Sequence, residues 1–523
     1  MLDNLIIVAY FLVVFGIGIY HSRRQRTTSE YFLAGHSIGW FAVGASLFST
    51  NISSEHFIGL AGSGASGGLA VGCYEWSASF CLFILGWLFV PYYLKSKVFT
   101  MPEFLERRFN SQCRWYLTIV SLIAYIFTKI SVHLFAGAIL MRSVLGWDYL
   151  TTSILLVLAT GIYTITGGLK AVIYTDLFQS FVLLTGAVVL TVLGLDKVGG
   201  FHGLRAALPP DFFHMIKPAS DPVYPWVGTI FGTMILGIWY WCTDQSIVQK
   251  TLSAKDLENA RKGSFFCAAL KILPVFVLVL PGLIAKALYP DVTGDNAYPI
   301  LVLRLLPKGL VGLMVAALLA ALMSAMSSVL NSCSTLITMD IFRKTHPNSS
   351  EARLVFVGRV ATGAIVGLSI LWVPLIQYLN NEIYQYLQSV QAYIGAPITA
   401  VFLTGVLWKR ATGRAAFTTL ITGGLLGAGR FVLDVMHDAF RVDLGPLNNL
   451  VKFSFLNYSV LVFLFCLLLM YVITVTEPRR SAAEDDNLVL QWGGGVTRVF
   501  DRADLAWTAM VGTFIIALWI HFA

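Results

Sequence analysis

Apolar residues occupy most of the chain in long runs that are separated by short polar segments. The runs do not alternate between apolar and polar positions as half-buried strands do, and stretches of about 20 apolar residues can cross a bilayer as helices. Lipid admits only helices and closed barrels, because every backbone group needs an internal partner there. The pattern predicts an all-α membrane protein with about 14 transmembrane helices, at residues 4–20, 39–62, 67–94, 115–144, 150–166, 171–194, 224–246, 263–287, 307–342, 353–377, 381–407, 413–435, 455–476 and 505–521.

Composition supports this class of protein. Of the 523 residues, 57% are hydrophobic and 12% are charged, whereas soluble proteins carry about 25% charged residues. A soluble enzyme, a nucleic-acid binder and a disordered scaffold are therefore excluded, and the lipid bilayer is the expected surrounding. The seven cysteines show no metal-like spacing and are interpreted as small core residues.

Lysine and arginine residues lie mainly in alternate loops, at 21–38, 95–114, 167–170, 247–262, 343–353, 409–414 and 477–503. The positive-inside rule places these loops in the cytoplasm. The chain is therefore predicted to be a multi-pass protein of the plasma (inner) membrane with both termini on the extracytoplasmic side. The polar segment at 477–503 is interpreted as a cytoplasmic connector.

Two apolar runs are interrupted at comparable points. Polar residues at 49–56 divide the second run, and the seventh is interrupted at Gly237 and continues into the polar end of 239–245. The two runs are five helices apart, so they enter the membrane from opposite sides. Such paired breaks are typical of inverted-repeat transporters. We expect five-helix repeats at 39–195 and 224–407, an extra helix and loop at 1–38, and three additional helices within 408–523.

Ionisable side chains lie within five of the predicted spans: His56, Glu75, Lys129, Asp176 and Lys271. Such groups are costly in a bilayer and usually face a bundle interior or a water-filled cavity. Each could form a structural ion pair or extend toward the membrane surface. Alternatively, Glu75 and Lys271 could bind a neutral polyol, because an acceptor and a donor together match hydroxyl groups.

The ninth run places Ser324, Ser327, Ser328 and Asn331 on one helical face. Their oxygen atoms are ligands that sodium or potassium accepts. Serines in membrane helices also mediate close packing or bond their own backbone. The broken helix and the acidic Asp176 together favour a cation site.

Several motifs occur in an order that resembles a known family. They are STNISSEHFIGLAGSG (49–64), YEW (74–76), WYWCTDQ (239–245), NSCSTLITMD (331–340) and QSVQAYIGAP (388–397). These stretches resemble the sodium/solute symporter family and, within it, the sodium/glucose cotransporter branch. The similarity runs in register from residue 1 to about 410 and more loosely to the end. It implies an inverted-repeat transporter bundle with a leading extra helix.

The resemblance also implies which residues bind sugar. The implied substrate site consists of Asn51, His56, Glu75, Tyr240, Trp241, Lys271 and Gln388. Trp241 would stack on the apolar face of a pyranose ring while the polar groups bond its hydroxyls. Tyr240 corresponds to an inner gate, and the outer gate corresponds to Leu60, Tyr74 and Tyr384.

Two sodium sites follow from the same resemblance. The first uses backbone oxygens of Ser49, Ile52 and Ala321 and the hydroxyl of Ser324. The family's second hydroxyl falls at Ala325, a departure that removes one side-chain ligand and is expected to weaken this site. A further sodium site of some members is matched by Asp176, Ser324, Ser327 and Ser328.

The combined prediction is sodium-driven symport of a glucose- or galactose-like hexose by alternating access. The protein would not be an enzyme and would need no cofactor besides sodium as the coupling ion. The alternatives are symport of another polyol such as myo-inositol, and a sugar sensor or channel of the same fold. A carboxylate substrate is disfavoured because Glu75 would repel it.

Overall fold

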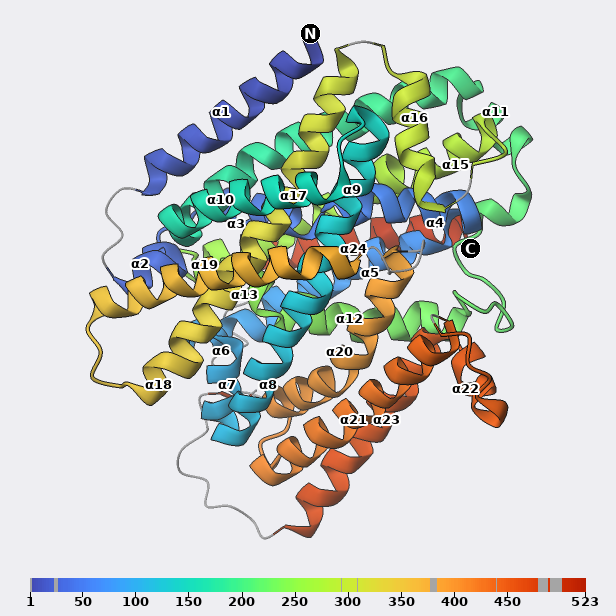
Figure 1. Cartoon of the computed structure of the whole chain (residues 1–523). Helices are drawn as coiled ribbons and strands as arrows, with labels where there is room; N and C mark the ends of the chain where they lie inside the picture. Colours follow the sequence, from blue (N-terminus) through green and yellow to red (C-terminus); the bar gives the residue numbers. More distant parts are fainter. Residues whose placement is uncertain are drawn as a thin grey trace.

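The computed structural model describes residues 2–22, 27–292, 294–307, 309–376, 383–438, 440–477, 488–489 and 501–523 (Figure 1). Regular structure in these residues is helical, and pairing of extended backbone is limited to two isolated bridges. The predicted all-α fold is confirmed. Residues 377–382, where the tenth predicted span ends and the eleventh begins, lie outside the described residues, as do 23–26 of the first basic loop and most of the 477–503 connector.

The first half of the chain contains α1 (Leu2–Ser22), α2 (Thr28–Leu33), α3 (Trp40–Asn51), α4 (Ala61–Gly67), α5 (Cys73–Ile84), α6 (Val90–Ser96), α7 (Met101–Arg108), α8 (Ser111–Ala124), α9 (Ser131–Leu145), α10 (Tyr149–Val198), α11 (Gly200–Ala207) and α12 (Thr233–Ile238). The second half contains α13 (Gln245–Leu252), α14 (Leu257–Leu270), α15 (Leu280–Leu288), α16 (Ala297–Leu305), α17 (Leu310–Thr335), α18 (Arg343–Thr345), α19 (Glu351–Ile376), α20 (Ile383–Leu407), α21 (Gly413–Asp438), α22 (Asn448–Lys452), α23 (Phe455–Thr476) and α24 (Arg502–His521).

Wide π-helical turns interrupt or extend many of these helices. They lie at His56–Leu60, Leu85–Phe89, Tyr125–Ile130, Gly228–Gly232, Trp239–Thr243, Val275–Val279 and Leu336–Phe342. Such turns often occur at functional sites because they displace side chains from the regular helical register.

Eleven helical segments of the described chain are long and apolar enough to cross a membrane. The difference from the fourteen predicted spans has a local cause. Residues 56–96 and 150–198 each join two predicted spans in one helical stretch, and the span predicted at 224–246 is broken. Gly68 (φ 76°, ψ −150°) and Gly168 (φ 52°, ψ −161°) turn the chain at the two joins, in a conformation that is essentially restricted to glycine. The structure supports a many-helix membrane protein, and fourteen crossings remain a prediction.

Both of the runs predicted to be interrupted contain a helix break, but only the first break lies where it was predicted. Ile52 ends α3 in an extended conformation (φ −78°, ψ 102°), and Asp244 adopts nearly the same conformation (φ −73°, ψ 128°) before α13. The second break is therefore at Asp244, and the prediction of an interruption at Gly237 was wrong. Gly237 lies within α12, where a Cβ would come 2.6 Å from Cys81 Sγ. This glycine permits close packing of α12 against α5 and does not end the helix.

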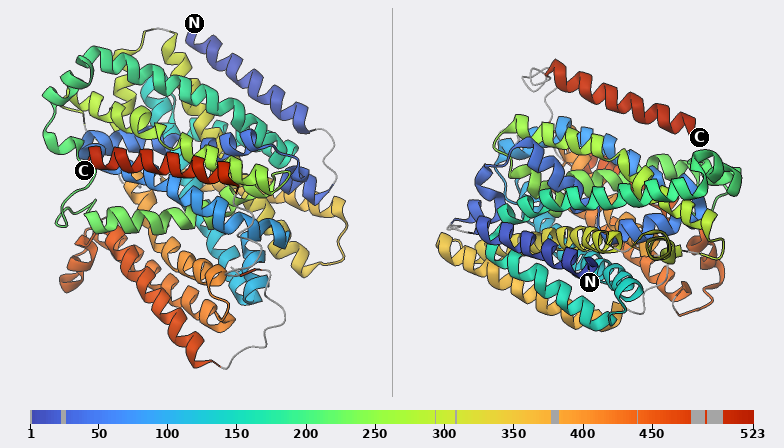
Figure 2. Two further views of the ribbon diagram at one scale, coloured as in Figure 1. Left: turned by 180° about the vertical axis from the view of Figure 1, so that it is seen from behind. Right: turned by 90° about the horizontal axis from the view of Figure 1, so that it is seen from above.

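The ends of the chain contact neighbouring connecting segments. Asp3 Oδ1 accepts hydrogen bonds from the backbone of Gly309 and Gly312 at 2.9 and 2.6 Å, and the Met215 N–H donates to the Phe522 carbonyl at 2.7 Å. Helices α20, α21 and α23 pack together beside the central bundle (Figure 1). Helix α24 lies across α5 and α14 on the outer surface of the bundle (Figure 2).

Candidate substrate and cation sites

A cavity of about 60 Å³ lies between the two helix breaks. Its walls include every residue predicted to bind substrate: Asn51, His56, Glu75, Tyr240, Trp241, Lys271 and Gln388. Residues separated by more than 300 positions are therefore brought together. The volume accommodates a few water molecules but is far below the ~300–1,000 Å³ of typical ligand pockets. In this conformation the lining side chains fill most of the space, so a ring-sized ligand requires them to move.

An ion pair forms one wall of the cavity. Lys271 directly follows α14, and its Nζ donates to Glu75 on α5 and to Asn51 Oδ1 at the end of α3, the latter at 2.6 Å. Lys271 and Glu75 are 1% and 2% exposed. His56 Nε2 lies 3.7 Å from the other oxygen of Glu75. The structure thus contains the ion pair that was one of the two interpretations of these residues, and it turns several hydrogen-bonding groups toward the cavity.

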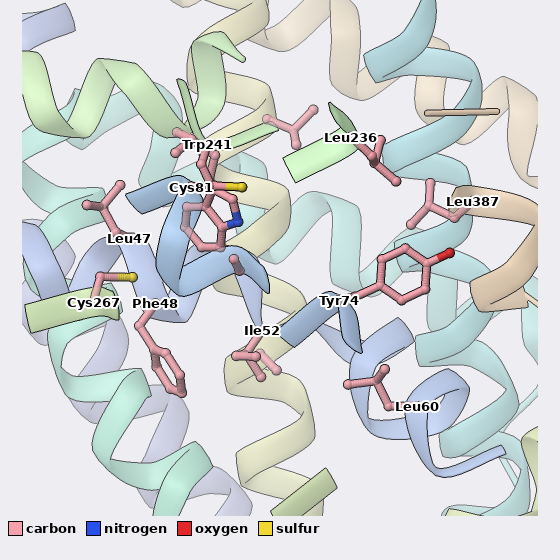
Figure 3. Packing of buried hydrophobic residues seen from close by; sticks show 14 of the residues in the cluster. Leu47, Phe48, Ile52, Leu60, Tyr74, Cys81, Leu236, Trp241, Cys267 and Leu387 are labelled. Atoms are coloured by element: carbon pink, nitrogen blue, oxygen red, sulfur yellow. The ribbon is translucent and has the colours of Figure 1, made fainter. Parts of the chain in front are cut away.

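Aromatic rings cover the cavity on two sides. Tyr240 and Trp241 pack edge to face at 5.2 Å in the turn before the second break. Tyr74 and Tyr384 pack in the same manner at 5.7 Å, and both rings line the cavity. Leu60 is buried in the same apolar cluster as Tyr74 and Trp241 (Figure 3), but it is not among the cavity-lining residues.

Two polar pairs each place at least one residue on the cavity wall, and the sequence predicts neither pairing. Lys129 Nζ donates to Asp244 Oδ2 at 2.8 Å, so the lysine noted within a span has its partner at the second helix break. The Glu55 carboxylate lies 2.7 Å from His133 Nδ1, and both residues line the cavity. Glu55 stands beside His56 in the first motif, but nothing in the sequence linked it to His133 on another helix.

The predicted first sodium site lies where α3 breaks beside α17. Ser49 Oγ donates to Ser324 Oγ at 3.0 Å, which joins the two elements directly. The Ser53 N–H lies 3.5 Å from His56 Nδ1, and the His56 N–H donates to the Ser53 carbonyl. In a continuous helix, the Ser53 and His56 N–H groups would bond the Ser49 and Ile52 carbonyls. Here they point to other acceptors and leave these two carbonyls without their helical donors. Broken helices expose carbonyl oxygens in this manner, and such oxygens suit a monovalent cation.

The predicted second sodium site has an occupant from the chain itself. Lys250 Nζ donates to Asp176 Oδ2, and both side chains are fully buried. Ser324 Oγ donates to Asp176 Oδ1 at 2.6 Å. Ser327 and Ser328 instead donate to the Ser324 carbonyl of their own helix, each at 2.9 Å.

Lys250 was not identified from the sequence. The charge pattern predicts a cytoplasmic loop at 247–262, and this boundary is wrong. Helix α13 continues to Leu252 and is buried along its whole length, because its polar side chains find partners inside the bundle. A buried lysine with a carboxylate partner can lie where hydropathy alone indicates a solvated loop.

Comparison with known proteins identifies the class. The sodium:solute symporter family profile matches residues 31–423. The chain is 43% identical to human (Homo sapiens) sodium/glucose cotransporter 4 over 94% of this chain and 78% of that protein. It is 39% identical to rabbit (Oryctolagus cuniculus) sodium/glucose cotransporter 1 over 91% and 79%, and 42% identical to rat (Rattus norvegicus) sodium/glucose cotransporter 2 over 82% and 71%.

Solved structures agree on the fold. A sodium-coupled sialic acid symporter in a substrate-bound outward-open state matches with a TM-score of 0.77 at 22% identity, over 92% of this chain and 99% of that chain. A nucleobase-cation-symport-1 family transporter matches with a TM-score of 0.56 at 15% identity, over 88% and 98%. The fold is that of a multi-pass membrane transporter. The chain belongs to the sodium:solute symporter family.

Proposed function

We propose that this protein is a sodium-driven symporter that carries a glucose- or galactose-like hexose across the plasma membrane by alternating access. One observation carries the proposal: all seven residues implied for sugar binding line a single cavity between two helix breaks. The similarity to proteins named sodium/glucose cotransporters supports sugar and sodium as substrates. Transport of this kind requires no covalent step, and sodium is the coupling ion.

In the proposed sugar site, Trp241 stacks on the apolar face of the ring. Asn51, Glu75, Lys271 and Gln388 bond its hydroxyls, which requires the Lys271–Glu75 pair to share its hydrogen bonds with the substrate. Because the cavity holds only about 60 Å³, binding is coupled to movement of the lining side chains. We propose that Tyr74 and Tyr384, with Leu60 behind them, close the outer side and Tyr240 the inner side.

The proposed coupling site comprises the carbonyls of Ser49, Ile52 and Ala321 and the Ser324 hydroxyl. A sodium ion there would hold the broken helix against α17, because its ligands come from both elements. We further propose that 39–195 and 224–407 are the inverted repeats flanked by 1–38 and 408–523. Both termini then face the extracytoplasmic side.

The central test is uptake into proteoliposomes that contain the purified protein. An inward sodium gradient should drive accumulation of radiolabelled glucose or galactose, and replacing sodium by potassium should abolish it. Accumulation of myo-inositol in place of hexoses would redirect the proposal to another polyol. Equilibration without accumulation would indicate a channel, and absence of counterflow would indicate a sensor.

Gln388→Ala is expected to weaken apparent sugar affinity several-fold. The loss of one hydrogen bond to a neutral group costs about 0.5–1.5 kcal/mol, and more where a buried partner is stranded. The measurement is the sugar concentration for half-maximal uptake at saturating sodium. Gln385→Ala is the matched control, because Gln385 lies on the same helix but lines a different cavity. Equal affinities in the two variants would remove Gln388 from the site.

Ala325→Ser is expected to tighten sodium activation several-fold. The serine supplies a second hydroxyl beside Ser324, and one added oxygen contact is worth about 1 kcal/mol. The sodium concentration for half-maximal uptake measures the effect. Ala325→Cys is the size-matched control, because a thiol is a poor ligand for a hard cation. If serine and cysteine shift sodium activation equally, Ala325 does not adjoin the coupling site.

A further inference from the structure

The buried ammonium group of Lys250 has the surroundings of a bound cation. Its Nζ donates to Asp176 Oδ2, to Thr50 Oγ1, to Ser46 Oγ at 2.8 Å and to the Ser46 carbonyl at 3.4 Å. A carboxylate, two hydroxyls and a carbonyl therefore surround it, and these are the oxygen ligands that alkali cations accept.

The Asp176 carboxylate has its remaining partners on α3 and α17. Ser46 Oγ donates to Oδ2 and Ser324 Oγ donates to Oδ1, both at 2.6 Å. The Lys250 and Asp176 side chains are both 0% exposed. The carboxylate is thus fully hydrogen-bonded, and its charge is balanced without any ion from solution.

A sodium ion on this carboxylate would add an unbalanced positive charge next to Lys250. Burying an uncompensated charge is strongly unfavourable, and two like charges at contact distance repel each other in a low-dielectric interior. Ser327 and Ser328 do not offset this cost, because their hydroxyls, which donate to the Ser324 carbonyl, are neutral and supply no negative charge. Lys250 and a second sodium ion therefore exclude each other.

We propose that Lys250 is a tethered cation that permanently occupies the Asp176 site, so that transport couples one sodium ion, and not two, to each sugar molecule. The single ion binds at the uncharged site of Ser49, Ile52, Ala321 and Ser324. Ser324 connects the two positions, because it accepts from Ser49 and donates to Asp176. The stoichiometry in this statement rests on the proposed function, whereas the occupation of the site by Lys250 does not.

The test counts sodium ions in two ways. Binding of radioactive sodium to the purified full-length protein gives ions bound per molecule, and initial sodium and hexose fluxes in proteoliposomes give the coupling ratio. We expect one ion and a ratio of one for the unmodified protein. Lys250→Met keeps an unbranched side chain of similar length and removes its charge, so it should raise both values to two.

Three variants serve as controls. Lys250→Arg should keep both values at one, and Lys250→Met combined with Asp176→Asn should return them to one because the carboxylate is gone. Lys262→Met removes a surface lysine that is paired with Glu258, and it should change nothing.

Two bound ions in the unmodified protein would overturn the inference, whatever the variants do. A folded Lys250→Met protein that still binds one ion would also overturn it. If Lys250→Met does not fold, the count for the unmodified protein and for Lys250→Arg decides. Absence of sodium-dependent hexose uptake together with one bound ion would refute the proposed function and leave the tethered cation in place.

Discussion

Trp241→Ala is expected to abolish detectable sugar binding. The indole is 2% exposed and lines the cavity beside Tyr240, where it offers the largest apolar face to a pyranose ring. Truncation of a buried aromatic anchor typically costs ~2–4 kcal/mol of binding, which corresponds to roughly 30-fold to 1,000-fold in affinity. The measurement is equilibrium binding of radiolabelled hexose to the purified protein at saturating sodium.

Two further variants distinguish the loss of stacking between Trp241 and the sugar ring from general disruption of the fold. Tyr240→Phe should be milder, because it keeps the ring and loses one hydroxyl. Trp87→Ala removes an indole that packs on Phe265 away from the cavity, and it should leave sugar affinity unchanged in folded protein. Wild-type affinity in Trp241→Ala would show that the sugar site lies elsewhere.

Lys271→Met should eliminate sugar uptake and destabilise the fold. The change leaves the Glu75 carboxylate buried and without its lysine partner, and removal of one member of a buried ion pair typically costs about 3–5 kcal/mol. The variant should therefore unfold at a clearly lower temperature than the unmodified protein. Uptake should be lost as well, because the proposed sugar site loses a charged hydrogen-bond donor.

The double variant Lys271→Met with Glu75→Gln distinguishes the two effects. It removes both charges, so most of the thermal stability should return, whereas uptake should not. Recovery of uptake together with stability would mean that the pair is purely structural and does not bind sugar. Lys262→Met serves again as the surface control, because its partner Glu258 is largely exposed.

Much of the fold could be predicted from the sequence because membrane helices are determined locally. Each helix satisfies its own backbone, so the length and apolar character of a run indicate a span without knowledge of its neighbours. The break around Ile52 was predicted on the same basis, because a cluster of polar residues interrupts the apolar run at this point. The prediction of a break at Gly237 fails because this glycine permits contact of α12 with Cys81 and does not end the helix.

The candidate sugar site was predicted for a different reason, and its role in sugar binding stays a proposal. Its residues lie in motifs that resemble a family, and the cavity then brought all seven of them together. The sequence identified Glu75 and Lys271 as a pair because both are ionisable and both lie in apolar runs. The sequence could not show that His133 contacts Glu55, because the two residues lie on different helices and share no motif.

The sequence alone determined the number of apolar runs, the break in the second of them and the ionisable groups that the membrane must accommodate. Only the tertiary structure decided which charges meet: Glu75 with Lys271, Lys129 with Asp244, and Asp176 with Lys250. The physical reason is the range of each effect. Helix formation in lipid depends on neighbouring residues, whereas the compensation of a buried charge depends on helices that pack together from distant parts of the chain.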